Sequence, residues 1–223
     1  MRTRHLFAAL SAIVVAAAPA PARAQEAAAR AAVQHAVNAW NAVRTVRASF
    51  EQTVSNALTG TSATARGDYQ QRRPGMLSVR FAEPDGDRIV ADGQWLWLYL
   101  PSSAPGQVIK RPESAQGSGT VDITGEFLDR PFEKYDIADG GAASVDGRAT
   151  RLVTLTPKPG GPDDFSKARV WIDDADGYIR QFEVAQRNGV TRRVRLTALQ
   201  VNVATDDSAF RFAVPKGARV VTR

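Results

Sequence analysis

The sequence predicts a mainly β protein: an antiparallel β-barrel or strongly curved sheet, with an N-terminal amphipathic helix and a short helical segment that could close over an apolar space as a lid. Short apolar runs with period-two alternation occupy most of the chain after residue 47, as in half-buried strands. Asx-Gly pairs separate several of these runs, as in hairpin turns. We expect residues 25–223 to form one domain, since all-β barrels of about 200 residues commonly fold alone.

Residues 1–24 have the pattern of an export signal. Arg2 and Arg4 form a basic start, residues 6–18 form a short apolar run, and residues 22–24 read Ala-Arg-Ala, a typical cleavage site. Pro19 and Pro21 are expected to end the helix ahead of that site. The apolar run is too short to span a bilayer. We therefore expect a cleaved signal peptide at residues 1–24 and an exported, soluble protein.

Residues 26–46 are predicted to form one amphipathic helix. Val33, Val37, Trp40 and Val43 recur at spacings of four, three and three, which places them on one face. The alanine-rich composition favours a helix, and the opposite face is polar. This helix should lie on an apolar surface.

Nearly all of the chain after residue 47 is predicted to be strand. Val79 and Phe81 alternate with polar neighbours, as do Val153 and Leu155. Residues 194, 196 and 198 form a similar apolar set in a later strand. Hairpins between such strands indicate an antiparallel meander. The turns are expected at Asp85-Gly86, Asp92-Gly93, Asp146-Gly147, Asp176-Gly177 and Asn188-Gly189.

The strand at residues 95–100 is apolar on both faces. Trp95, Trp97 and Tyr99 share one face, and the three leucines between and after them share the other. A strand with one solvated face would alternate apolar and polar residues. We therefore expect the curved sheet to enclose an apolar interior and to carry a further segment on its far side.

Residues 117–131 interrupt the strands and are predicted to form the helical lid. Phe127 and Leu128 are its largest apolar side chains, and three glycines precede them. The expected strands and this segment together could enclose an apolar space. Whether side chains fill that space or a ligand occupies it stays open, since small barrels do both.

Few residues point to catalysis or to a metal. His35 is the only histidine after residue 24, and the chain has no cysteine. Paired aspartates in turns are interpreted as solvated residues, although a weak calcium site at Asp173, Asp174 and Asp176 stays open without the spacing of an EF-hand. We predict a protein that is not an enzyme and has no metal or cofactor.

The charge balance argues against a nucleic-acid partner. Residues 1–24 contain three arginines and no acidic residue, so without them the net charge falls from +6 to +3. No stretch concentrates lysines and arginines among aromatic residues, which is the usual signal of nucleic-acid binding.

Several short motifs occur in a fixed order along most of the chain. The set begins with residues 48–52, Ala-Ser-Phe-Glu-Gln, and is most specific at residues 90–93, Val-Ala-Asp-Gly. The other matching pieces are Gly67-Asp68-Tyr69, Arg73-Pro74, Glu83-Pro84, Leu96-Trp97, Tyr99, Phe210 with Phe212, and Pro215 with Gly217.

In order and spacing these motifs resemble the LolA family of periplasmic lipoprotein carriers. The resemblance implies an incomplete antiparallel β-barrel (a curved sheet) with a helical lid over an apolar cavity, and a soluble, monomeric periplasmic chaperone that binds the acyl chains of lipoproteins. It also implies two partners: an inner-membrane ABC transporter that releases lipoproteins, and an outer-membrane lipoprotein acceptor. The family's arginine before proline corresponds to Arg73, which is expected to latch the lid through its backbone carbonyls. Arginine suits that role because it offers five donors and keeps its charge.

The lid matches the family less well than the rest of the chain. Residues 119–125, Gly-Thr-Val-Asp-Ile-Thr-Gly, lack the proline and apolar run expected there. Arg72 adjoins Arg73, and successive strand residues face opposite ways. Only one of the two arginines should therefore face the cavity, and the sequence does not say which.

We expect one face of the curved sheet to contact the acyl chains. Its predicted lipid-binding residues are Phe50, Leu77, Val79, Phe81, Ile89, Leu96 and Leu98, with Arg73, Phe127 and Leu128 as latch and lid. Trp95 and Trp97 are the alternative inward pair. The alternative function is a carrier or sensor of another lipid or a glycolipid on the same half-barrel, such as the RseB-like stress regulators.

Overall fold

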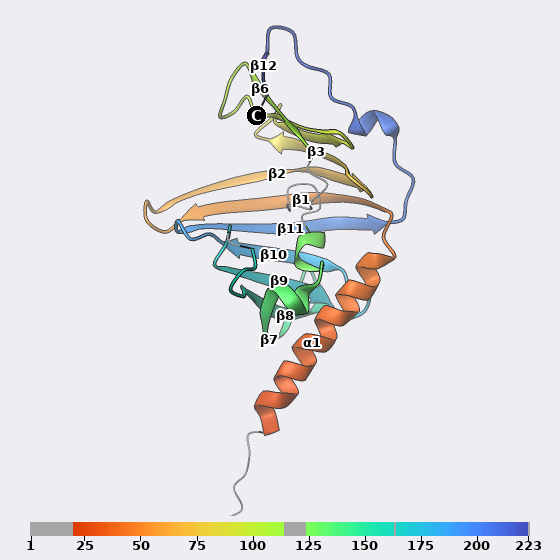
Figure 1. The fold of residues 1–223 in the computed structure, drawn as a ribbon, viewed down its shortest axis with the longest axis vertical. Coiled ribbons are helices and arrows are strands. Elements are labelled where there is room, and N and C mark those ends of the chain that lie inside the picture. The colour runs from red at the N-terminus through yellow and green to blue at the C-terminus, as the bar shows by residue number, and fades with distance from the viewer. Residues whose placement is uncertain (1–19, 114–123, 163, 223) are drawn as a thin grey trace, which may run out of the picture.

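A computed structural model describes residues 20–113, 124–162 and 164–222. It consists of one open, curved sheet of twelve strands, and the long N-terminal helix lies on one face of that sheet (Figure 1). The sheet order is β12-β6-β5-β4-β3-β2-β1-β11-β10-β9-β8-β7. All neighbouring strands are antiparallel except β12, which pairs parallel with β6. The predicted mainly β, incomplete barrel is confirmed.

The helices and strands together account for most of the described chain. Their bounds are α1 (Ala20–Asn41), β1 (Thr45–Asn56), β2 (Thr61–Arg72), β3 (Met76–Glu83), β4 (Arg88–Asp92), β5 (Trp95–Tyr99), β6 (Gln107–Pro112), η1 (Gly125–Phe127), α2 (Pro131–Lys134), β7 (Tyr135–Val145), β8 (Arg148–Pro157), β9 (Lys167–Asp173), β10 (Ile179–Ala185), β11 (Val190–Val201), η2 (Asp207–Phe210) and β12 (Arg219–Thr222).

Two meanders make up the sheet. Strands β1 to β6 form one and β7 to β11 form the other, and β1 pairs with β11 to join them. That pairing brings together residues about 145 positions apart, such as Phe50 and Leu196. The five predicted Asx-Gly turns are all present, and each glycine has a positive φ between 75° and 92°, as hairpin turns of this kind require.

Helix α1 lies across β7, β8 and β9 (Figure 1). Its predicted end at residue 46 is wrong, because it ends at Asn41 and Val46 is already in β1. Thr45 and Val46 are β-branched and fit a pleated, half-buried surface better than a helix. The helix also starts earlier than predicted, with Pro21 in its first turn, where proline is tolerated.

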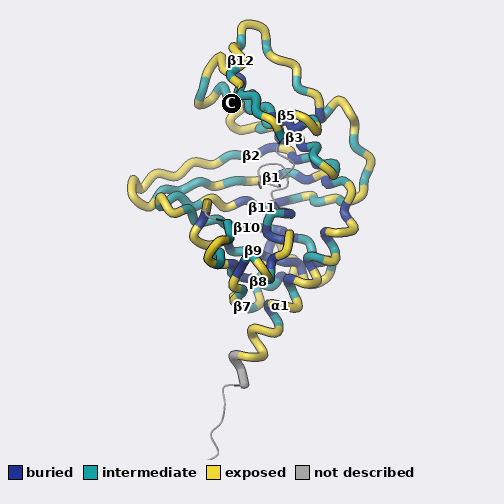
Figure 2. The backbone as a smooth tube through the Cα atoms, in the orientation of Figure 1, coloured by how far each residue is buried: buried dark blue, intermediate teal, exposed yellow. Residues whose placement is uncertain are grey.

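Most of the buried hydrophobic residues form one cluster that joins α1 and η1 to the sheet, and Figure 2 shows the buried stretches along the strands. Val33, Ala36 and Trp40 enter it from α1, and Phe127 enters it from η1. Leu96 in β5 is also a member, whereas Trp97 is not. The leucine face of β5 is therefore the inward one.

The far side of β5 is covered by the chain that follows β11. The ring of Phe212 stacks on that of Trp97 with the centroids 5.4 Å apart, and Phe212 also lies 6.4 Å from Tyr99. Lys110 of β6 lies 3.8 Å from the ring centroid of Trp95. The C-terminal segment thus provides the second cover that the apolar faces of this strand require.

Strand β11 departs from the predicted alternation near its end. Ala198 was expected to face inward with Val194 and Leu196, but it is exposed and has a φ of +49°. The register with β1 shifts between Arg47 and Ser49, as at a β-bulge. The strand phase therefore changes, and Leu199 packs against the core instead.

Candidate functional site: an apolar interior closed by the N-terminal helix

A cavity of about 10 Å³ lies beneath the last turns of α1. Its wall comes from α1, β1, β2, the turn between β9 and β10, β10, β11 and the segment at residues 124–128. The lining residues are Ala36, Trp40, Val46, Tyr69, Thr124, Leu128, Gly177, Tyr178, Ile179, Leu196, Leu199 and Val201. The wall is almost wholly apolar, so it suits hydrocarbon rather than a charged ligand.

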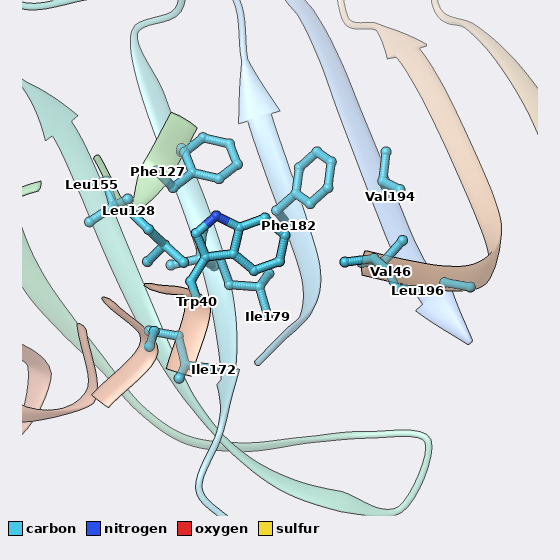
Figure 3. Packing of buried hydrophobic residues seen from close by; sticks show 14 of the residues in the cluster. Trp40, Val46, Phe127, Leu128, Leu155, Ile172, Ile179, Phe182, Val194 and Leu196 are labelled. Atoms are coloured by element: carbon cyan, nitrogen blue, oxygen red, sulfur yellow. The ribbon is translucent and has the colours of Figure 1, made fainter. Parts of the chain in front are cut away.

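The described part of the predicted lid packs directly on this interior. Phe127 in η1 contacts Phe182 of β10 with ring centroids 5.5 Å apart, and it lies 6.3 Å from Phe165. Leu128 is buried and lines the cavity. Figure 3 shows both residues beside the indole of Trp40. Residues 117–123, the first part of the predicted lid, lie outside the described residues.

The seven residues predicted to bind lipid all lie in the core cluster or pack against it. Phe50 and Phe81 meet edge to face with centroids 5.3 Å apart. Phe50 in β1 and Phe81 in β3 are both cross-strand partners of Gly67, which lies in β2 between them. Val79, Ile89 and Leu98 are successive cross-strand neighbours from β3 to β5. These residues thus form one continuous apolar surface on the concave face.

Gly67 allows this close approach of the two phenylalanines. A Cβ atom at residue 67 would lie 2.0 Å from the carbonyl oxygen of Arg80. That distance is far below any van der Waals contact, so only glycine fits between β1 and β3 here.

The small cavity and the predicted lipid-binding surface share no residue. Leu128 is the one predicted site residue that lines the cavity. Sequence reasoning missed Trp40, Tyr69, Ile179 and Leu196 as wall residues. Trp40 belongs to the apolar face of the predicted helix, and that face is the sequence signal that indicates its inward position.

Arg73 joins the start of β3 to the end of α1. Its Nη1 donates to the carbonyl oxygens of Trp40, at 2.8 Å, and Val43, at 3.4 Å. Its guanidinium carbon lies 5.3 Å from the ring centroid of Trp40. The last carbonyls of a helix have no partner within the helix and carry partial negative charge, so a cation stabilises them. Arg73 was predicted to donate to backbone carbonyls of the lid, residues 117–131, and residues 117–123 of that segment lie outside the described residues.

Arg72 points to the other face of the sheet. It forms an ion pair with Asp207 and lies 4.9 Å from the ring centroid of Phe210, both in η2. Since η2 follows β11 and covers the convex side of β3, Arg72 holds the C-terminal segment. Arg73 is therefore the arginine on the cavity side.

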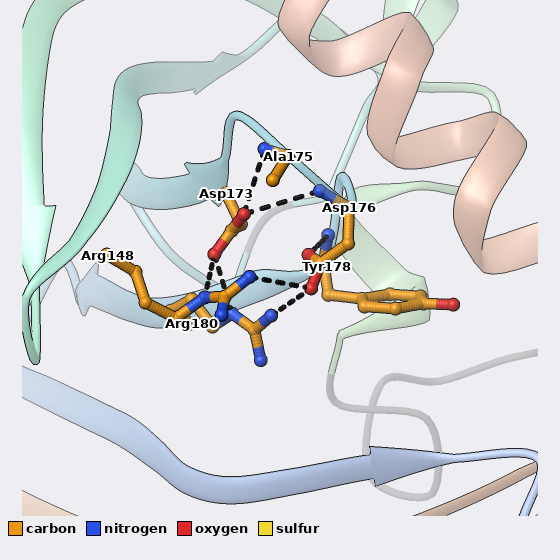
Figure 4. A network of polar contacts seen from close by, with 6 residues as sticks. All are labelled: Arg148, Asp173, Ala175, Asp176, Tyr178 and Arg180. Carbon is orange, nitrogen blue, oxygen red and sulfur yellow. Dashed lines mark hydrogen bonds and ion pairs between the residues drawn. The ribbon is translucent and has the colours of Figure 1, made fainter.

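Two of the three aspartates considered for calcium, Asp173 and Asp176, form an ion-pair network with two arginines (Figure 4), and Asp174 is exposed beside it. Asp173 accepts from Arg148 and from Nε of Arg180, the latter at 3.0 Å. Asp176 accepts from Nη2 of Arg148 at 3.0 Å and from Arg180. Within the described ranges no three acidic, histidine or cysteine side chains gather as a metal site.

The charge of Asp173 is stabilised strongly. Burial raises its pKa, but hydrogen bonds from Arg148, the amide of Ala175, Arg180 and the amide of Asp176 outweigh that effect and lower the pKa well below its usual value. The network fixes the turn between β9 and β10. Gly177 in that turn packs against α1, since a Cβ there would lie 3.0 Å from the carbonyl oxygen of His35.

A larger open groove adjoins the cavity where β10 and β11 separate. It has a volume of about 450 Å³ and shares Leu196 and Leu199 with the cavity wall. Val145, Asp146, Arg148, Arg180, Thr197 and Ala198 complete its lining. Only residues 191–195 of β11 pair with β10, which leaves this gap in the sheet.

Comparisons with known proteins agree with the resemblance seen in the motifs. Residues 41–213 match the family model described as outer membrane lipoprotein carrier protein LolA. An outer-membrane lipoprotein carrier protein of Cupriavidus necator is 32% identical, over 99% of this chain and 99% of that protein. Another, of Halorhodospira halophila, is 29% identical over 80% of this chain and 79% of that protein.

The fold also has a counterpart among solved structures. An uncharacterized conserved protein from Thermus thermophilus superposes with a TM-score of 0.54, covering 88% of this chain and 99% of that chain at 15% identity. Across the described residues, no helix is both long and apolar enough to cross a membrane. With a family match over most of its length and a relative above 30% identity along nearly the whole chain, this protein belongs to the LolA family of outer-membrane lipoprotein carriers.

Proposed function

We propose that this protein binds the acyl chains of lipoproteins released from the inner membrane and carries them across the periplasm to an outer-membrane acceptor. It does so as a soluble monomer that receives cargo from an ABC transporter. The observation that supports this most is the continuous apolar surface from Phe50 to Leu98 on the concave face, which belongs to the same core as α1 and the lid residues Phe127 and Leu128.

The small volume of the cavity implies that loading requires opening. A space of about 10 Å³ has room for about one water molecule. An acyl chain therefore enters only if α1 and residues 124–128 move off the sheet. Contacts among Trp40, Leu128 and Phe182 are then exchanged for contacts with the chain. Each methylene removed from water contributes ~0.8 kcal/mol, which offsets the lost internal packing.

Arg73 acts as a reversible latch in this scheme. Its hydrogen bonds to Trp40 and Val43 each contribute about 0.5–1.5 kcal/mol net. Such bonds can break without unfolding the sheet, because the strand ladders do not depend on them. Phe50, Leu77, Val79, Phe81, Ile89, Leu96 and Leu98 supply the acyl-chain surface, and Phe127 and Leu128 supply the lid.

A release-and-transfer assay tests the function. Inner-membrane vesicles containing the transporter and a triacylated lipoprotein are incubated with the purified protein and ATP. We expect the lipoprotein to appear in the supernatant in a one-to-one complex and then to transfer to outer membranes. A lipoprotein whose acylated cysteine is replaced by serine serves as the control. Lack of release, or equal binding of the unacylated control, would contradict the proposal.

A further inference from the structure

The indole nitrogen of Trp40 is a buried hydrogen-bond donor without an acceptor. Trp40 is 7% exposed, and its Nε1 has no hydrogen-bond partner among the described residues. Trp40 also lines the cavity beneath α1. Figure 3 shows the nitrogen on the edge of the ring that faces Phe127 and Leu128, on the inner side of the lid segment.

An unpaired donor in this position requires an explanation. More than nine in ten buried polar groups in proteins have a partner, and an indole N–H can only donate. Tyr69, Thr124 and Tyr178 also line the cavity, but within the described residues no oxygen lies within hydrogen-bond distance of the indole nitrogen. A phenylalanine would fill the site without the cost of an unpaired buried donor. The indole nitrogen is therefore suited to donate to an acceptor that a bound ligand supplies.

The donor is also held in a fixed orientation. The Arg73 guanidinium lies over the indole ring, 5.3 Å from its centroid. The same guanidinium donates to the backbone carbonyl of Trp40 at 2.8 Å. Two contacts from one residue therefore restrain both the ring and the backbone of the last helical turn, and a pre-oriented donor loses little entropy when it binds.

We infer that the indole N–H of Trp40 donates to the carbonyl oxygen that joins an acyl chain to its headgroup, so that the site recognises acyl esters or amides rather than hydrocarbon alone. This inference rests on the proposed acyl-chain binding. A methylene chain has no acceptor, whereas an ester or amide oxygen is a neutral acceptor that can enter an apolar site. The carbonyl then lies beneath α1 and the chain extends along the concave face.

A matched pair of ligands tests this recognition. The ligands are two lysophospholipids with the same headgroup and chain length, one ester-linked and one ether-linked, used below their micelle concentrations. Each displaces an apolar fluorescent dye from the protein. We expect the native protein to bind the ester about 2- to 10-fold more tightly than the ether, the range that one net hydrogen bond supplies.

Two variants separate the donor from the ring. Trp40→Phe keeps an aromatic ring and removes the donor, so the ester-to-ether affinity ratio should fall to about one. A change in packing or in the contact with Arg73 would affect both ligands alike and leave that ratio unaltered. Trp171→Phe is the matched control, because Trp171 is 8% exposed, packs on Arg169 at 5.1 Å and does not line the cavity. This control should keep the native ratio.

The outcomes distinguish the inference from the proposed function. A ratio of one in the native protein, or an unchanged ratio in a folded Trp40→Phe protein, would overturn the role of the indole while leaving acyl-chain binding intact. Failure of both ligands to displace the dye would instead contradict acyl-chain binding itself. The native ratio needs no variant, so the inference is tested even if Trp40→Phe fails to fold.

Discussion

The Nη1 atom of Arg73 donates to the carbonyl oxygen of Trp40 at 2.8 Å, and the same guanidinium lies 5.3 Å from the centroid of the Trp40 ring. The corner that leads into β3 is thereby tied to the last turn of α1. Because Trp40 also lines the cavity, moving α1 away to admit a ligand must disturb this pair. The position of the helix and the occupancy of the interior are coupled through these two residues.

Replacing Arg73 with leucine should impair cargo release more than uptake. The change removes donors that hold α1 closed and adds apolar surface near the cargo, and both effects favour the open, loaded state. The measurement is lipoprotein uptake from inner-membrane vesicles followed by transfer to the acceptor. We expect near-native uptake and a loss of transfer of roughly tenfold or more, the equivalent of one or two hydrogen bonds.

Arg72→Leu is the matched control for this experiment. Arg72 pairs with Asp207 on the opposite face, so its variant should transfer cargo normally. Impaired transfer in Arg72→Leu with normal transfer in Arg73→Leu would show that the latch is the other arginine. Normal transfer in both would remove the latch altogether.

A charge at residue 81 should abolish binding of an apolar fluorescent probe. Phe81 lies against Phe50 on the concave face, and an ionised carboxylate there would have to be desolvated beside the ligand. Arg80→Asp is the matched control, because it places the same carboxylate on the preceding residue, which is exposed and faces the other side of the sheet. Probe titration should therefore separate the two variants, and native affinity in a folded Phe81→Asp protein would contradict the proposed lining.

Gly67→Ala should destabilise the protein by about 1–3 kcal/mol, the usual range for overpacking. The new methyl group would lie 2.0 Å from the carbonyl oxygen of Arg80, so β2 or β3 must shift. Urea unfolding is the measurement. Ala63→Ser, at an exposed position on the same strand, should change stability by less than about 0.5 kcal/mol. Equal stability of the two variants would mean that β3 moves aside freely.

Asp173→Asn should lower stability at neutral pH by about 1.5–3 kcal/mol, the range for hydrogen bonds to a charged group. The pKa of Asp173 in the folded protein lies well below the ordinary value of about 4. The contribution of this group to stability is therefore fully present above that ordinary value and is lost as the pH falls through the folded pKa. The native protein should therefore lose more stability than the variant below about pH 4.

Unfolding curves measured from pH 7 down to pH 2 check this behaviour. Asp174→Asn is the control, because it removes the same charge from an exposed neighbour. Its pH profile should follow that of the native protein. A parallel profile for Asp173→Asn would show that the network with Arg148 and Arg180 does not stabilise the fold.

Local sequence patterns predicted the strands and the turns, but they did not decide the inward face of β5, because both faces of that strand are apolar. Alternation and Asx-Gly pairs are short-range signals, and the five turns formed where those pairs occur. The same reasoning placed the end of α1 five residues too late, because Val43 and Val46 continue the helical spacing although Val46 pairs with β11. Competition between a helix and a distant strand cannot be seen in a local window.

The cavity wall was only partly predictable for the same reason. Leu128 came from the predicted lid, but Ile179 and Leu196 reach the cavity through the pairing of β1 with β11 and the turn held by Asp173 and Arg180. The bulge near Ala198 then reverses the strand phase and directs Leu199 inward. Neither the partner strand nor the bulge leaves a clear mark in the sequence.

Mass spectrometry of the bound material tests the central claim most directly. The protein is purified under native conditions from the periplasm of its own bacterium, and the organic-soluble and protein fractions are analysed separately. The account predicts diacylated or triacylated lipoproteins, recovered in one-to-one complexes and absent from a Phe81→Asp control. Recovery of free phospholipid or glycolipid in place of lipoprotein would contradict the lipoprotein-carrier function and favour a carrier or sensor of another lipid.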